Sequence, residues 1–185
     1  MNHMAKASRR RTLTIRRGLT NFYLMAVVLT LVVLVQATLL ARVRLVGASP
    51  NLLLVVVVCW SLIRGVSDGL IWGFVGGLAL DVIAGLPIGT SSLALMATTP
   101  LAGLGKNSVF PGSLTLPILL VALATPVYGW MVLLSEMIRG IPVDWLASTV
   151  RIIGPEIALN VALVVIVYPA LRWLATQIRP AQMEW

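Results

Sequence analysis

Residues 72–86 read WGFVGGLALDVIAGL, an apolar stretch interrupted by a single acidic residue, Asp81. The stretch belongs to a longer row of residues spaced four apart: Gly65, Gly69, Gly73, Gly77, Asp81 and Gly85. A spacing of four places neighbours on one ridge of a helix, and a ridge of glycines lets a second helix approach closely. A carboxyl group in lipid is costly and needs a partner or a function. The stretch therefore predicts a tightly packed membrane helix whose one acid has a specific role.

The whole chain has the composition of a membrane protein. Hydrophobic residues make up 59% of its 185 residues and charged residues only 11%, whereas soluble domains carry about 25% charged residues. Six of the 14 basic residues lie in the first 17 positions. This predicts a basic cytoplasmic tail at residues 1–19 beside anionic lipid, rather than nucleic-acid binding. The single cysteine, Cys59, excludes an internal disulfide.

Apolar segments separated by turn residues predict an all-α bundle of six membrane-spanning helices. The membrane domain is expected over residues 20–179, followed by a short cytoplasmic tail at residues 180–185. Five spans are the alternative, if two of the short segments form one re-entrant pair. The six expected spans are residues 20–41, 50–63, 69–86, 91–104, 113–138 and 155–178.

The distribution of basic residues predicts that both termini lie in the cytoplasm. With six spans, ten Lys and Arg residues fall on the side of the termini and four on the other side, and basic residues favour the cytoplasmic side. The stretch SRRRTL at residues 8–13 resembles a twin-arginine export signal. The apolar run that follows is longer than that of a signal peptide, so we expect the first span to remain as an uncleaved anchor.

The sequence shows no pattern typical of a catalytic or metal site. Asp81 has no second aspartate at its depth with which to form an aspartyl-protease pair. The only histidine, His3, lies in the N-terminal tail, so a zinc site is not expected. We therefore expect no enzyme activity, no metal and no cofactor.

Four polar residues of the expected spans fall toward the outer side: Asn51, Asp81, Glu156 and Asn160. Two roles for Asp81 remain open. It is either part of a site for a proton, ion or substrate, or a structural group paired with an outer-side arginine, with Asn160 or with Glu156.

The glycine row also has two interpretations. Gly69, Gly73 and Gly77 either pack against other helices of this chain or form a docking face for a partner's helix. Four-residue steps drift by about 40° each on a helix of 3.6 residues per turn, so the row winds round the helix. Its two ends therefore cannot both face one straight neighbour.

The segment at residues 49–95 resembles the MreD family of bacterial rod-shape-determining proteins. Members of that family open the second span with Pro-Asp/Asn-Leu-Leu-Leu, which here begins at Pro50 and Asn51. The third span follows with Gly-Phe-x-x-Gly-Leu-x-x-Asp, here from Gly73 to Asp81. A Leu-x-x-Gly turn comes next, here residues 86–89.

The resemblance implies a non-enzymatic scaffold of the cell-elongation (rod) complex in the bacterial inner membrane. Its implied direct partner is MreC, whose single membrane helix would pack on Gly69, Gly73 and Gly77. RodA, an elongation-class penicillin-binding protein and membrane lipids are further implied partners, MreB is an indirect one, and no nucleic acid is expected.

The family is also similar in fold to the S components of energy-coupling-factor transporters. Vitamin binding as such a subunit is therefore the alternative function. A small proton-coupled exporter that uses Asp81 is a third possibility.

Overall fold

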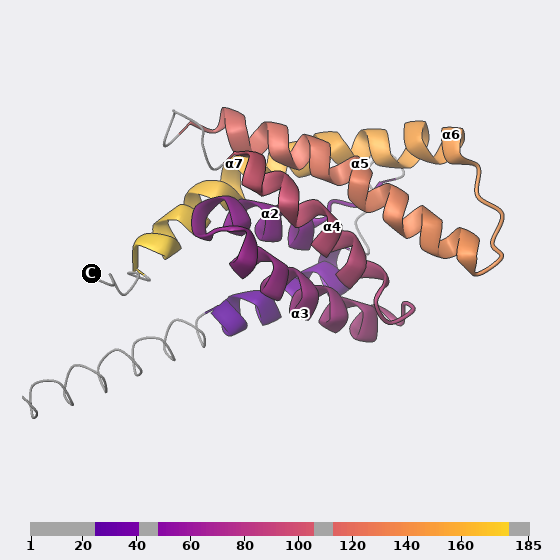
Figure 1. The fold of residues 1–185 in the computed structure, drawn as a ribbon, viewed down its shortest axis with the longest axis horizontal. Coiled ribbons are helices and arrows are strands. Elements are labelled where there is room, and N and C mark those ends of the chain that lie inside the picture. The colour runs from indigo at the N-terminus through magenta and orange to yellow at the C-terminus, as the bar shows by residue number, and fades with distance from the viewer. Residues whose placement is uncertain (1–24, 41–47, 106–112, 178–185) are drawn as a thin grey trace, which may run out of the picture.

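The structure is a computed structural model that describes residues 25–40, 48–105 and 113–177. These residues form an all-helical bundle (Figure 1), so the predicted all-α fold class is confirmed for them. The two expected tails, residues 1–19 and 180–185, lie outside the described residues, as do the first residues of the expected first span.

The helices of the bundle coincide with the apolar segments of the sequence. Residues 25–35 are helical and continue into a π-helical turn, η1 (Gln36–Leu40). The remaining elements are α2 (Leu52–Arg64), α3 (Val66–Ala84), α4 (Thr90–Leu104), α5 (Thr115–Ile138), α6 (Trp145–Ser148), η2 (Thr149–Ile153) and α7 (Gly154–Gln177).

Three helices of the described part are long and apolar enough to cross a membrane. They are Val66–Ala84, Thr115–Ile138 and the continuous helix Trp145–Gln177, which α6, η2 and α7 form together. The two shorter apolar helices are Met25–Thr38 and Leu52–Arg64. The count of six spans and the likeness to S components stay predictions.

Helix α2 lies at the centre of the bundle. It contacts α3, α4, α5 and α7, and its nine consecutive residues from Leu53 to Ser61 are all buried. A helix that is hydrophobic on every side needs cover on every side. The run LLLVVVVCW therefore makes α2 the core around which the other helices are arranged.

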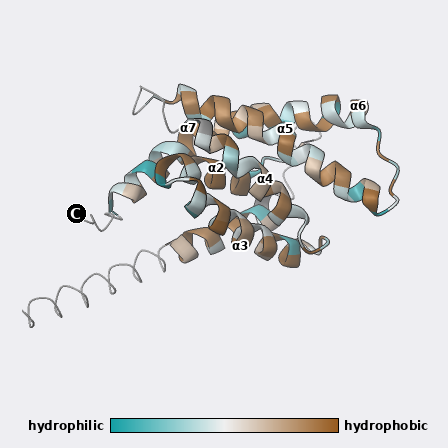
Figure 2. Cartoon of the chain, in the orientation of Figure 1, coloured by the Kyte–Doolittle hydropathy of each residue, from teal (hydrophilic) through white to brown (hydrophobic). Residues whose placement is uncertain are grey.

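The outward faces of the surrounding helices are apolar. Figure 2 shows hydrophobic residues along the outer sides of α3, α5 and α7. On α3 the exposed face consists of Ile71, Phe74, Val75, Val82 and Ile83. In water such a large apolar surface would promote aggregation, but it is compatible with the hydrocarbon core of a bilayer. The structure thus has the surface of a membrane protein.

The turn between α3 and α4 depends on two glycines. Gly85 ends α3 with a φ of 66°, and Gly89 precedes α4 with a φ of 101°. Side chains with a Cβ rarely adopt this left-handed region of backbone conformation. The turn brings the first residues of α4 back against the end of α3, and α3 and α4 then pack along each other.

Candidate functional site

The glycine row of α3 faces two other helices of the same chain. A Cβ added to Gly69 would coincide with the hydroxyl oxygen of Ser61 in α2. A Cβ added to Gly77 would lie 2.5 Å from the backbone Cα of Ser92 in α4. The row therefore shifts from α2 toward α4 along its length, as the drift of a four-residue spacing requires.

Two further glycines of α3 complete this close packing. A Cβ on Gly73 would lie 3.3 Å from Val57 in α2, which is tight but faces a side chain rather than backbone. Gly76, outside the four-residue row, faces the first helix, where its Cβ would lie 2.8 Å from a methyl group of Leu29. The glycine faces of α3 are thus occupied by helices of this chain.

Asp81 is fully buried and caps the next helix. Its carboxylate accepts hydrogen bonds from the backbone N–H groups of Gly89, at 2.9 Å, and Ser91, at 3.0 Å. The first N–H groups of a helix have no acceptor within the helix, and Gly89, at the N-cap of α4, has no side chain to supply one. The carboxylate also carries the charge that the positive end of a helix dipole favours.

The structure pairs Asp81 with backbone groups of the next helix. Among the described residues its hydrogen bonds run to backbone N–H groups of α4 and its turn, not to an outer arginine, Asn160 or Glu156. The physical reason is local. The α3–α4 turn places the uncapped start of α4 within reach of the carboxylate.

Asn160 of α7 joins three helices at the same end of the bundle. Its fully buried side-chain oxygen accepts a hydrogen bond of 2.7 Å from the backbone N–H of Asn51, and its side-chain nitrogen donates one of 3.1 Å to the hydroxyl of Thr125 in α5. The side chain of Asn51 in turn accepts from the backbone N–H of Leu54 and caps α2. Glu156, one turn before Asn160, interacts with its side chain.

Two more polar side chains extend these contacts to the remaining helices. Tyr128 of α5 donates to the hydroxyl of Ser91 at 3.5 Å and also interacts with the side chain of Asn51. Gln36 of the first helix donates to the carbonyl of Pro50 at 3.2 Å and accepts from the N–H of Leu52 at 2.8 Å. We call this set the polar cluster: Gln36, Asn51, Asp81, Ser91, Thr125, Tyr128 and Asn160.

Sequence reasoning identified Asn51, Asp81 and Asn160 but missed four members of the polar cluster. Gln36, Thr125 and Tyr128 are polar residues inside largely apolar helices, and Ser91 lies in the polar first turn of α4. A polar residue within an apolar segment was the signal that could have identified the first three. A polar side chain buried in lipid or protein needs a hydrogen-bond partner.

The hydrogen bonds of the polar cluster are internal to the chain. Each member donates to or accepts from another residue of the chain, so its polar atoms serve to fix helix ends and helix pairs. Within the described part of the chain, no three His, Cys, Asp or Glu residues lie close enough to hold a metal ion.

A small pocket lies at the opposite end of the bundle. Its volume is about 130 Å³, and residues 61–66 line it together with Ala102 and Gly103. Pockets for small organic ligands usually measure about 300–1,000 Å³. Arg64 lies in this wall, 5.9 Å from the ring centre of Trp60 and 3.6 Å from the carboxylate of Asp68.

The model of the family described as rod shape-determining protein MreD matches residues 17–178. A search of curated proteins and a search of solved structures returned no match.

Proposed function

Because the chain belongs to the MreD family of rod shape-determining proteins, we propose that it is a non-enzymatic scaffold of the rod complex. It binds MreC and helps to position RodA and an elongation-class penicillin-binding protein, with MreB as an indirect partner. The observation that carries the proposal is the family match over residues 17–178. Family membership supports a role in rod shape determination, and the individual partners are our proposal.

The geometry of the bundle supports a scaffold. The polar cluster ties α2, α4, α5 and α7 together, and the glycines of α3 allow close packing against α2 and α4. These features favour a rigid platform, because buried hydrogen bonds and close-packed helices resist rearrangement.

We place the membrane helix of MreC on an exposed apolar face of the bundle. The row of Gly69, Gly73 and Gly77 contributes to MreC binding indirectly. Its glycines are in contact with α2 and α4, so they hold α3 in place within the bundle. We also place the protein in the inner membrane with both termini in the cytoplasm, on the basis of its basic residues.

Vitamin binding as an S component has less support. The polar atoms of Asn51, Asp81 and Asn160 are directed at other residues of this chain. A vitamin site in that region would need these groups to exchange internal hydrogen bonds for ligand contacts, which lowers the net gain from binding.

Purification from bacterial membranes with identification of bound proteins tests the proposal. The scaffold predicts that MreC is recovered with the full-length chain in a mild detergent. Recovery of an ATPase with a transmembrane coupling subunit, and no MreC, would support the vitamin-transport alternative instead.

Complementation tests the cellular role. In rod-shaped cells depleted of their own MreD, the wild-type chain should restore rods. Gly77→Leu should not, because its side chain would meet the backbone of α4. Ile83→Leu is the matched control, since Ile83 is exposed on the same helix. Round cells with normally accumulated wild-type protein would contradict a role in shape.

A further inference from the structure

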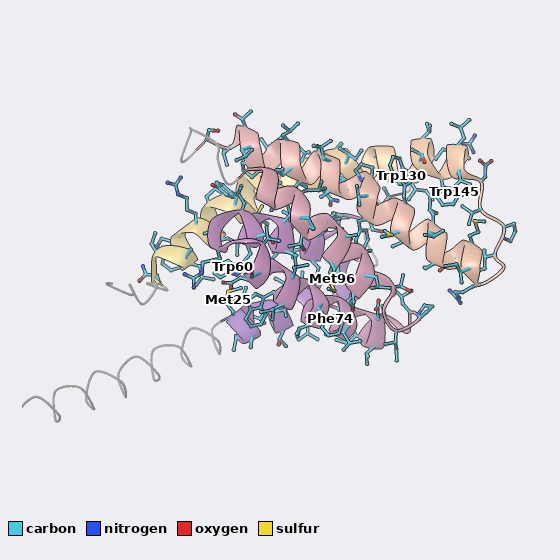
Figure 3. The ribbon with its side chains drawn as sticks, viewed as in Figure 1. Met25, Trp60, Phe74, Met96, Trp130 and Trp145 are labelled. Atoms are coloured by element: carbon cyan, nitrogen blue, oxygen red, sulfur yellow. The ribbon has the colours of Figure 1, made fainter. Side chains whose placement is uncertain are left out.

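The last third of the bundle contains a segment with no buried side chain. Residues 130–152 comprise the last nine residues of α5, the connection to α6, α6 itself and most of η2, and none of them is buried. In Figure 1 this segment, which we call the tip, extends past the turn between α3 and α4. Trp130 and Trp145 lie in it, near the α6 end of the view (Figure 3).

The backbone hydrogen-bond pattern of α5 is interrupted where the helix enters the tip. Pro126 lies inside the helix and has no N–H, so the carbonyl four residues earlier loses its helical hydrogen bond. The hydroxyl of the preceding residue, Thr125, donates to the carbonyl of Val121 at 2.8 Å, an arrangement that bends helices.

The regular hydrogen-bond pattern of the returning helix is interrupted as well. η2 is a turn of π-helix, in which the N–H of Gly154 bonds to the carbonyl of Thr149, five residues earlier. Pro155 follows directly and again removes a donor. π-Turns and prolines are the usual sites at which a long helix bends.

The two interruptions face each other. A Cβ on Gly129 would lie 2.8 Å from the side chain of Ile153, so the backbone of α5 lies close to η2 at this point. The indole N–H of Trp130 donates to the hydroxyl of Thr149 at 3.2 Å and links the helices on the tip side. On the other side, Asn160 holds both helices to the start of α2.

We propose that the tip pivots as one unit about this paired interruption, with Pro126 on one helix and η2 with Pro155 on the other. The tip is held loosely, because none of its side chains is buried and Val132 is the tip residue that packs partly against the hydrophobic core. Pro126 and Ile138 are about 18 Å apart along the helix axis, so a 20° change of bend moves the end of the tip by about 6 Å. This movement goes beyond the proposed scaffold, which does not itself require a moving part.

Electron-spin distance measurements on the full-length chain in lipid nanodiscs test the pivot. One label at Leu146→Cys and one at Val82→Cys span the tip and the bundle, and both sites are well exposed. A second pair, at Val82→Cys and Leu119→Cys, lies wholly on the bundle side of the pivot and is the matched control. Cys59 is replaced by alanine in all variants.

The tip pair should give a distance distribution broader by about 6 Å than that of the control pair. Pro126→Ala, or deletion of Val150 to remove the extra residue of η2, should narrow it, while the control pair stays unchanged. Equal, narrow distributions in the wild-type background would overturn the pivot. If the tip distribution is broad and neither Pro126→Ala nor the deletion of Val150 narrows it, the assignment of the pivot to Pro126 and η2 would be wrong.

Discussion

The carboxylate of Asp81, near the end of α3, accepts a hydrogen bond of 3.0 Å from the backbone N–H of Ser91, in the first turn of α4. The two residues are ten positions apart, and the turn between them contains both left-handed glycines, Gly85 and Gly89. Asp81 therefore acts as the N-cap side chain that α4 lacks. The acid that distinguishes this helix in the sequence stabilises its neighbour.

Asp81→Asn should destabilise the bundle by about 1–2 kcal/mol. Both carboxylate oxygens of Asp81 face backbone donors, so an amide would turn its NH₂ group toward an N–H and lose the charge at the helix end. The unfolding temperature can be measured by heating the protein with a fluorescent thiol reagent. The reagent reacts with the single thiol, Cys59, only when the bundle unfolds, because Cys59 is fully buried in the folded state.

Asp68→Asn is the matched control for that change. Asp68 is partly exposed and pairs with Arg64 at 3.6 Å, so its loss should change the stability by less than about 0.5 kcal/mol. If both substitutions lowered the unfolding temperature equally, the capping role of Asp81 would be wrong.

Gly77→Ala should lower stability by about 1–3 kcal/mol, because its Cβ would meet the backbone of Ser92, which can move only with α4. Gly73→Ala should be close to neutral. There the nearest atom is a side-chain methyl group of Val57 at 3.3 Å, and alanine favours the helix. Thermal unfolding of the two variants measures this difference in stability. A larger loss of stability for Gly73→Ala than for Gly77→Ala would contradict the described packing.

Asn160→Leu should destabilise the bundle by about 2–3 kcal/mol. The change leaves the N–H of Asn51 and the hydroxyl of Thr125 buried without their present partner. Ile166→Leu on the same helix is the control, since Ile166 is 72% exposed and its replacement removes no hydrogen bond. Equal unfolding temperatures for the two variants would show that Asn160 does not join the helices as described.

The orientation in the membrane can be tested with single cysteines in a Cys59→Ala background. With both termini in the cytoplasm, Leu146→Cys lies on the outer side and Ser67→Cys on the cytoplasmic side. A membrane-impermeant maleimide should label the first in intact spheroplasts and the second only after permeabilisation. The reverse pattern would place the termini outside.

The sequence predicted those features that depend on one segment at a time. Apolar runs indicated an all-helical membrane protein, and the order of motifs from Pro50 to Gly89 indicated the MreD family, which the match over residues 17–178 confirms. The four-residue glycine spacing identified a close-packed ridge on α3, whose neighbours in this chain are Ser61, Val57 and Ser92.

The contacts of the polar residues were beyond what the sequence shows. Asp81 bonds to backbone N–H groups, which every residue except proline carries, so no side chain marks them in the sequence. Gln36 bonds to the backbone of Pro50 and Leu52, Thr125 to Asn160 and Tyr128 to Ser91, and these residues meet only because helices distant in the chain lie side by side. A pattern of spacings along one helix contains no information about which helix lies opposite.

The central position of α2 has a consequence for biogenesis. Residues Leu53 to Ser61 are covered on all sides by helices, two of which, α5 and α7, begin 51 and 90 residues after Arg64. During synthesis α2 therefore enters the bilayer long before α5 and α7 have been made. Until α7 is in place, the backbone N–H of Asn51 lacks its acceptor, the side chain of Asn160. Assembly of the bundle is completed only when the C-terminal helix leaves the insertion machinery, so a chain truncated before α7 leaves its core helix exposed to lipid and to membrane proteases.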